Sequence, residues 1–133
     1  MKKLLFILLL CPVFSFAQEE WEKVGTAKNG DEYFIRDVTQ KKDSSKIQFW
    51  QKMIKSLDYK PTSKTDLLAP GGFVLTRYDA DCDERTIHAQ MMVYYDKDGN
   101  PLKSHICIFK ETYVIPDSIG ETFLLSACIK LLD

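Results

Sequence analysis

The sequence predicts an α+β fold, an antiparallel sheet of about six strands with a C-terminal helix packed on it. Short runs rich in β-branched and aromatic residues alternate with turn signals along most of the chain. A helix-capping signature occurs near the C-terminal end. The strongest turn signal is Asp98-Gly99, which separates the runs 85–95 and 101–109. We expect these two runs to form the central hairpin of the sheet.

The register of this hairpin follows from its alternating residues. The first run places one set on a common face: Ile87, Ala89, Met91, Val93 and Tyr95. The second run does the same with Leu102, Ser104, Ile106 and Ile108. The two faces coincide when Val93 lies opposite Ser104 and Met91 opposite Ile106. A loop of two residues or one of four (97–100) gives that register, whereas a loop of three would turn one apolar set to water.

The N-terminal segment has the three parts of a secretory signal peptide. Lys2 and Lys3 precede the apolar stretch 4–14, and the small-x-small triplet 15–17 follows it. We therefore expect residues 1–17 to be removed and residues 18–133 to form a single exported domain. The alternative is a lipoprotein signal with Cys11 as the lipidated residue. Leu10 stands where a small residue is expected, so a lipid anchor is disfavoured.

The charge balance argues against nucleic-acid binding. Removal of Lys2 and Lys3 leaves 16 basic and 19 acidic residues, a net charge of −3. Proteins that bind nucleic acids in general carry a basic footprint instead.

Between the signal peptide and the hairpin we expect four further strands. The first two are 21–27 and 32–37, joined at Asn29-Gly30, and the fourth is 73–78. The third, 46–57, is ambiguous, because Ile47, Trp50, Ile54 and Leu57 fit helical spacing as well. The long connection 56–72 contains Pro61 and Pro70, and its length is typical of a mobile or binding loop.

After the hairpin, residues 111–117 read as a loop and residues 118–132 as a helix. Ser118 and Glu121 form a capping box at its start. Ile119, Phe123, Ala127 and Leu131 line one face of this helix, and Leu125 and Ile129 point the other way. Such a helix is expected to be buried on two sides, against the sheet and against a second subunit.

Three cysteines remain after signal cleavage: Cys82, Cys107 and Cys128. Export permits a disulfide, and one bridge with one thiol left over allows three pairings. Cys107 lies in mid-strand, where a buried, inert thiol is expected. Cys82 in its loop and Cys128 on the helix are freer to meet.

No residue pattern predicts catalysis, a metal site or a cofactor. His88 and His105 are expected on one face of the hairpin about 13 Å apart, too far for one metal ion to bridge. The acidic run 79–84 lacks the glycine and the distal glutamate of a calcium loop. A serine-nucleophile motif of the G-x-S-x-G type is absent.

The middle of the chain carries the strongest binding signal. Lysines and aromatic residues alternate there, and they could hold an acidic partner, although a solvated edge explains the lysines as well. The candidate ligand-binding residues are Lys41, Lys42, Lys46, Trp50, Lys52 and Lys55.

Several segments occur in the order found in one known family. They are Trp21, Tyr33-Phe34-Ile35, Phe49-Trp50, Asp81-Cys82, Arg85, the stretch 95–99, the stretch 115–121 and Cys128. In this order the chain resembles the surface-adhesin protein E family of small exported bacterial proteins, from Trp21 to Leu132. The resemblance implies an antiparallel sheet, and it favours a strand for 46–57. It also implies a Cys82–Cys128 disulfide that ties the C-terminal helix to the sheet, and a homodimer.

Two functions are consistent with these features. The first is a non-catalytic binding or adhesion domain at the cell envelope, whose partner is a host matrix protein or an anionic glycan. The alternative is a periplasmic structural or assembly factor that binds another envelope protein.

Overall fold

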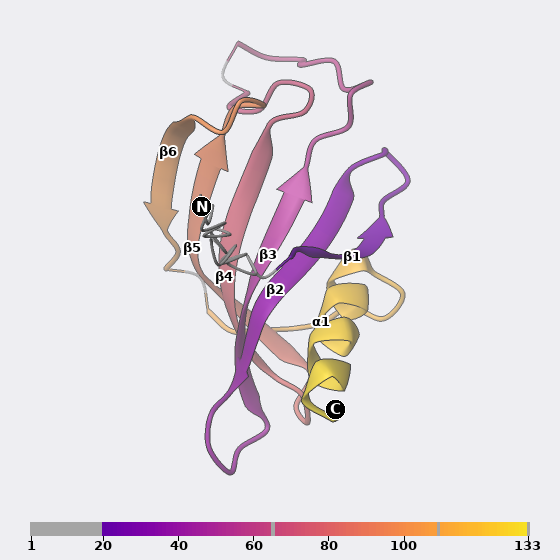
Figure 1. The fold of residues 1–133 in the computed structure, drawn as a ribbon, viewed down its shortest axis with the longest axis vertical. Coiled ribbons are helices and arrows are strands. Elements are labelled where there is room, and N and C mark those ends of the chain that lie inside the picture. The colour runs from indigo at the N-terminus through magenta and orange to yellow at the C-terminus, as the bar shows by residue number, and fades with distance from the viewer. Residues whose placement is uncertain (1–19, 65, 109, 133) are drawn as a thin grey trace, which may run out of the picture.

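The computed structural model describes residues 20–64, 66–108 and 110–132, and its strands form a seven-stranded antiparallel sheet (Figure 1). Six strands neighbour each other in chain order: β1 (Glu22–Thr26), β2 (Glu32–Gln40), β3 (Lys46–Ile54), β4 (Phe73–Asp81), β5 (Thr86–Tyr95) and β6 (Pro101–Ile106). The helix α1 (Ile119–Ile129) ends in a 3₁₀ turn at Lys130–Leu132. This architecture confirms the predicted fold class. The signal peptide predicted for residues 1–17 lies outside the described residues.

One strand falls where the sequence predicted a loop. The short β7 (Thr112–Tyr113) pairs with the start of β5, so that Thr112 lies opposite Ile87 and Tyr113 opposite Thr86. Two residues are too few to show an alternating pattern, which explains why the segment reads as a loop.

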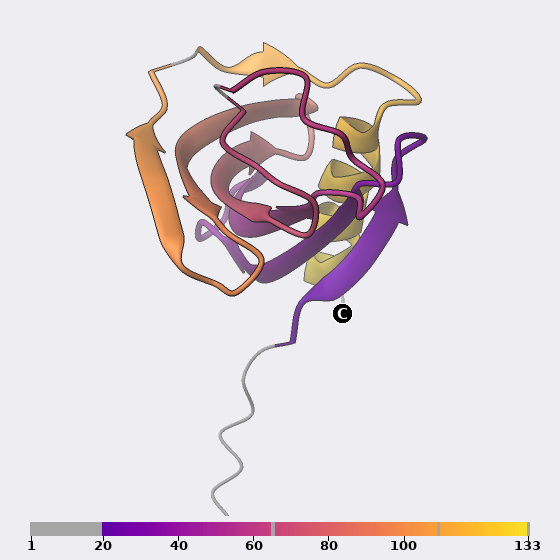
Figure 2. The ribbon, with the colours of Figure 1, turned by 90° about the horizontal axis from the view of Figure 1, so that it is seen from above.

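The two faces of the sheet differ in what covers them. We call the side that packs on α1 the helix face and the opposite side the open face. The core lies between the helix face and α1, and its buried members are Ile35, Ile47, Phe49, Ala80, Phe123, Leu124 and Ala127. In Figure 2 the sheet is strongly curved and α1 lies along one side of it, beside β1.

Three aromatic rings form the centre of the core. Phe123 of α1 lies 6.0 Å from Phe49 and 5.3 Å from Tyr78, measured between ring centroids. Phe49 and Tyr78 are themselves stacked at 5.6 Å. Burial, with a smaller contribution from Tyr33 and Cys107, raises the pKa of Tyr78 to about 12. The phenol therefore stays neutral within the core.

The ambiguous segment 46–57 is a strand, as the family resemblance favoured. Along β3, buried residues alternate with partly exposed ones: Ile47, Phe49 and Gln51 face α1. Trp50 and Ile54 lie on the open face, so their helical spacing with Ile47 does not reflect a shared side.

A bulge in β5 divides the face predicted for the hairpin. Arg77 of β4 pairs with Met91, but the next residue, Tyr78, pairs with Ala89, so Gln90 is the extra residue. Each such insertion reverses the alternation of the strand. Ile87 therefore packs against the core, whereas Met91, Val93 and Tyr95 lie on the open face. The prediction that these residues share one face with Ile87 and Ala89 is wrong.

The predicted register of β5 with β6 is confirmed, but by a loop that the sequence argument excluded. Val93 lies opposite Ser104 and Met91 opposite Ile106. The backbone N–H of Asp96 donates to the carbonyl of Asn100, which closes a loop of three residues, 97–99. An irregularity between Tyr94 and Tyr95 restores the register, because it shifts the pairing by one residue.

The C-terminal helix is fixed at both ends. Ser118 is the N-cap, and its hydroxyl accepts a hydrogen bond from the N–H of Glu121 at 3.2 Å. Glu121 also forms an ion pair with Arg85 at the β4–β5 turn. Near the other end, Cys128 forms a disulfide with Cys82, whose Cα atom lies 6.0 Å away. Cys107 is a free thiol, half-buried just beyond β6 rather than in mid-strand.

Candidate functional site

The open face carries apolar, aromatic and cationic side chains in rows that cross the strands. One row consists of Arg36, Trp50, Arg77, Met91 and Ile106, which pair in succession from β2 to β6. The next consists of Phe34, Lys52, Leu75, Val93 and Ser104. Most of these side chains are partly exposed. An antiparallel sheet with one solvated face normally shows polar residues there, so this composition indicates a contact surface.

Three cations of the open face lie over aromatic rings. The Arg36 guanidinium lies 4.4 Å from the ring centroid of Trp21, and the Lys52 ammonium lies 4.5 Å from that of Phe73. The Arg77 guanidinium lies 5.6 Å from the ring of Trp50. Each ring attracts its cation and holds it on the surface. The result is a fixed arrangement of positive charge above an apolar sheet face, which we call the aromatic–cation surface.

Lys52 is the cation at the middle of this surface. Burial, and secondly the positive charge of Arg36, lower the pKa of its ammonium group below 10.5. Arg36 forms an ion pair with Asp37 at 3.3 Å, and Arg77 donates a hydrogen bond to Gln48 at 2.9 Å. An anionic group placed beside Lys52 would raise this pKa again, because its negative charge favours the charged ammonium group.

The six candidate ligand-binding residues do not form one site. Trp50 and Lys52 lie two residues apart on the open face of β3. Lys55, beyond the end of β3, forms an ion pair with the buried carboxylate of Asp31 at 3.2 Å. That carboxylate also accepts the backbone N–H of Ser56, so Lys55 belongs to a structural contact that fixes the start of the 56–72 connection.

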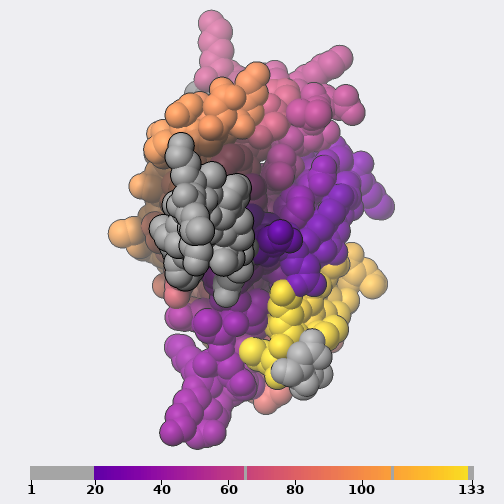
Figure 3. Space-filling view, viewed as in Figure 1, coloured from indigo at the N-terminus to yellow at the C-terminus, as the bar shows by residue number. Residues whose placement is uncertain are grey.

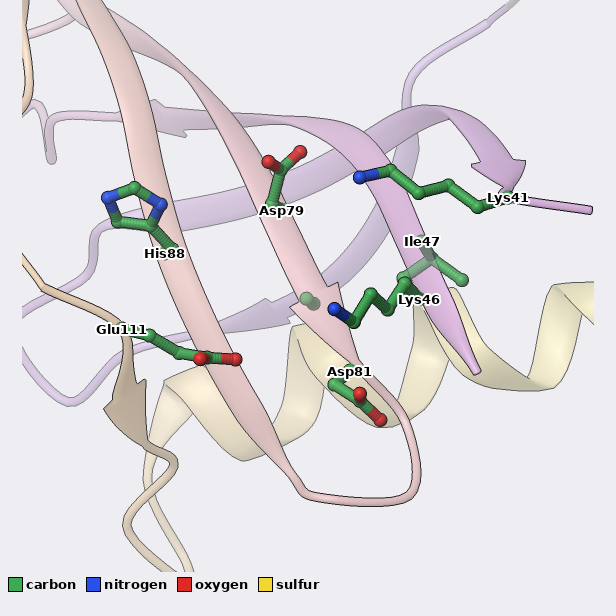
Figure 4. A pocket seen from close by; sticks show the side chains of 8 residues that line it. Lys41, Lys46, Ile47, Asp79, Asp81, His88 and Glu111 are labelled. Atoms are coloured by element: carbon green, nitrogen blue, oxygen red, sulfur yellow. The ribbon is translucent and has the colours of Figure 1, made fainter. Parts of the chain in front are cut away.

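The remaining three lysines lie near the β2–β3 turn. Lys42 is exposed in the turn itself. Lys41 and Lys46 line a polar hollow together with Asp79, Asp81, His88 and Glu111 (Figure 4). In this view both ammonium groups extend toward the carboxylates. Because the hollow contains carboxylates as well as lysines, it is not the basic patch that the sequence suggested.

The comparison with protein families gives a match. The model of the family described as surface-adhesin protein E matches residues 21–129, which is most of the chain. This chain belongs to the surface-adhesin protein E family. Neither the comparison with curated proteins nor that with solved structures gives a match. The family implies an adhesin-type role at the surface of the cell, without an enzymatic activity.

In this adhesin E domain, four residues of the aromatic–cation surface were missed by the sequence reasoning: Trp21, Arg36, Phe73 and Arg77. Each lies in or beside a predicted strand to which the sequence analysis assigned no binding role. Their contribution depends on which strands are neighbours, because Arg36 and Arg77 flank Trp50 from different strands. The sequence did contain one signal for them. Phe73 and Arg77 are four residues apart on one strand, so an aromatic and a cationic side chain share a face of the sheet.

The histidines of the adhesin E domain lie on opposite faces, not on one face as predicted. His105 pairs with Met92 as expected and contacts the ring of Tyr94 on the helix face. The bulge at Gln90 places His88 on the open face, opposite Asp79. Continued along both strands, the predicted register would place Phe109 opposite His88, but Phe109 lies outside the described residues. Within the described residues, no group of three or more His, Cys, Asp and Glu side chains could hold a metal ion.

No helix in the described part of this adhesin E domain is long and apolar enough to span a bilayer.

Proposed function

We propose that residues 18–133 form an exported, non-catalytic binding domain that holds an acidic macromolecule on the aromatic–cation surface. The observation that carries this proposal is the set of three cations, each over an aromatic ring, on a sheet face that α1 does not cover. Family membership supports an adhesin-type role, and the signal peptide predicted for residues 1–17 supports export.

The partner class follows from the chemistry of the surface. Arg36, Lys52 and Arg77 attract carboxylates or sulfates, and their positions are fixed before binding, so little side-chain entropy is lost. Trp21, Trp50 and Phe73 supply large apolar contact areas beside them. A host matrix protein with an acidic surface and an anionic glycan both offer the complementary groups.

The test uses immobilised matrix proteins, the sulfated glycan heparin and neutral dextran as probes. The mature chain is expected to bind at least one acidic probe saturably and not to bind dextran. Trp50→Ala and Lys52→Gln should each weaken that binding about tenfold, as expected for residues at the centre of an interface.

A matched control separates the surface from general charge. Lys42→Gln removes one exposed positive charge from the β2–β3 turn, away from the aromatic rings. It should change the affinity by less than about twofold, because rim charges act weakly at physiological salt. Equal losses for Lys42→Gln and Lys52→Gln would show that binding depends on net charge and not on this surface.

The second candidate function, a periplasmic assembly factor, is favoured by the outer side of α1. Leu125 and Ile129 are exposed there, one helical turn apart. Pull-down from a periplasmic extract should then recover a bacterial envelope protein, and Leu125→Glu should abolish the recovery. Trp50→Ala would leave it intact.

A further inference from the structure

The two edge strands of the sheet, β1 and β6, differ in how far they are protected from pairing with another strand. At the β1 edge, the pairing is interrupted by a bulge between Lys23 and Gly25. Lys23 forms an ion pair with Glu32, and Glu22 forms one with Lys130 of the C-terminal turn. The helix also approaches so closely that a Cβ atom added at Gly25 would lie 3.4 Å from Ile119. Bulges, charges and a covering helix are the devices by which proteins protect an edge strand.

At the β6 edge these devices are confined to the first three positions, which hold Pro101, a bulge at Leu102 and Lys103, and α1 packs near the β1 edge instead. In the described part of the chain, β6 pairs with β5 on one side and with no strand on the other. It lies at the outer rim of the molecule in Figures 1 and 3. Pro101 blocks hydrogen bonding at the first position of the strand, but the remaining residues carry backbone N–H groups.

The direction of these backbone groups follows from the pairing with β5. The N–H of Cys107 donates to the carbonyl of Gln90 at 2.8 Å, so the backbone of Cys107 points inward. Successive residues of a strand direct their backbone groups to opposite sides. Ser104 and Ile106 therefore present their N–H and C=O groups to the open edge.

The side chains of this edge alternate in character as well. Ile106, on the open face, is 84% exposed, and Ile108 just beyond it is 91% exposed. Lys103 and His105 lie on the helix face of the same strand. The edge thus offers an apolar contact on one face and a positive one on the other.

We propose that the β6 edge binds an extended segment of another polypeptide by strand addition, and that apolar residues alternate with acidic ones in that segment. The apolar residues lie beside Ile106 on the open face, and an acidic residue lies beside Lys103 on the helix face. The backbone groups of Ser104 and Ile106 supply the hydrogen bonds.

Charge complementarity favours another polypeptide over a second copy of this chain. Strand β6 contains Lys103 and His105 and no carboxylate. Antiparallel pairing of two β6 strands would bring the Lys103 ammonium groups of the two copies near one another on the same face, and like charges across strands are destabilising. An acidic segment meets the same backbone groups without that repulsion.

The test uses a display library of random twelve-residue peptides, selected on residues 18–133. We expect selected peptides to show alternating apolar and acidic residues, and their binding to slow hydrogen exchange at the amides of Ser104 and Ile106. Ser104→Pro, which removes an outward N–H, should weaken binding about tenfold, as expected for losing strand hydrogen bonds. Selection on Lys103→Glu should yield basic residues in place of acidic ones.

Two controls make the outcome decisive. A selected peptide that is N-methylated at alternate backbone positions should lose binding to the unaltered chain, which tests the hydrogen bonds even if Ser104→Pro fails to fold. Trp50→Ala should leave peptide binding unchanged, so a failure of the aromatic–cation surface and a failure of the β6 edge are distinguishable. The proposal is overturned if no alternating peptide is selected, if N-methylation has no effect, or if Trp50→Ala abolishes binding. Protection of the Ser104 and Ile106 amides by self-association, without peptide, would assign the edge to a second copy instead.

Discussion

The helix face and the open face of this sheet are both rich in apolar and aromatic side chains, yet α1 covers one and leaves the other. On the helix face, Phe49 and Tyr78 pack against Phe123 and are largely buried. On the open face, Trp50 and Phe73 lie beside cations and stay partly exposed. The first arrangement stabilises the fold, and the second is available to a partner.

This difference has a physical basis in what each aromatic ring contacts. A ring that packs on other rings and aliphatic groups gains from the loss of water contact, by about 25 cal/mol per Å² of apolar area. A ring that holds a cation at the surface gains less, because both groups remain hydrated. The helix face is therefore expected to dominate stability and the open face to dominate binding.

The largest expected effect is the loss of stability when an aromatic side chain of the core is truncated. Phe123→Ala removes the aromatic side chain that joins α1 to the sheet, and it should lower the free energy of unfolding by about 3–5 kcal/mol. Phe73→Ala, the matched change on the open face, should cost less than half as much. Urea denaturation of both variants measures the difference, and equal losses would contradict the division into a structural and a binding face.

The second test removes the covalent link between α1 and the sheet. Cys82 and Cys128 are separated by 46 residues, and opening a loop of that length should destabilise the fold by about 2–4 kcal/mol. The double variant Cys82→Ser with Cys128→Ser should therefore unfold at lower urea concentration. Cys107→Ser, which leaves the bridge intact, should change stability by less than about 1 kcal/mol. Mass spectrometry of the non-reduced chain checks the pairing.

Sequence patterns predicted the elements better than the faces. The Ser118 cap and the Asp98-Gly99 turn are local, so residues close in the chain determine them. The bulge at Gln90 is not local, because it depends on how β5 pairs with β4. Because the sequence analysis did not predict this bulge, it placed Met91 and Val93 on the same face as Ile87.

The candidate site depended even more on strand pairing. Trp50 and Lys52 could be selected from the sequence because they lie two residues apart on one strand. Arg36 and Arg77 could not, since they become neighbours of Trp50 through pairing with two other strands. Lys55 was selected for its charge, but its ion pair with Asp31 involves a residue from the β1–β2 turn.

A smaller test concerns the turn that leads from β4 to the disulfide. The Asp81 carboxylate accepts hydrogen bonds from the N–H groups of Glu84 and Asp83 and from the Ser45 hydroxyl. These bonds, that of Glu84 first, lower the pKa of Asp81 below 3.8. A lowered pKa contributes stability above pH 3.8, and that contribution is lost as the pH falls through the lower folded value.

Asp81→Asn should accordingly destabilise the domain by about 1 kcal/mol at neutral pH. The Asn amide oxygen still accepts a hydrogen bond, so the loss is the size of an ordinary hydrogen bond and smaller than that of a charged one. The difference in the free energy of unfolding between the variant and the unaltered chain should narrow below pH 3.8. It should vanish once the carboxyl is protonated in both the folded and the unfolded state. Urea denaturation from pH 7 to pH 2 follows this difference. A difference that is independent of pH would mean that the carboxylate charge does not stabilise this turn.

The smallest expected effect lies on the open face and concerns charge rather than stability. Burial is the larger cause of the lowered pKa of Lys52, and the charge of Arg36 is the smaller one. Arg36→Gln removes only the smaller cause, so the pKa of Lys52 should rise but stay below 10.5. An NMR titration of the Lys52 side chain measures this shift. A bound sulfated or carboxylated probe should raise the same pKa further, because its negative charge lies beside the ammonium. If Arg36→Gln left the pKa unchanged, the two cations would be electrostatically independent, and the aromatic–cation surface would not act as a unit.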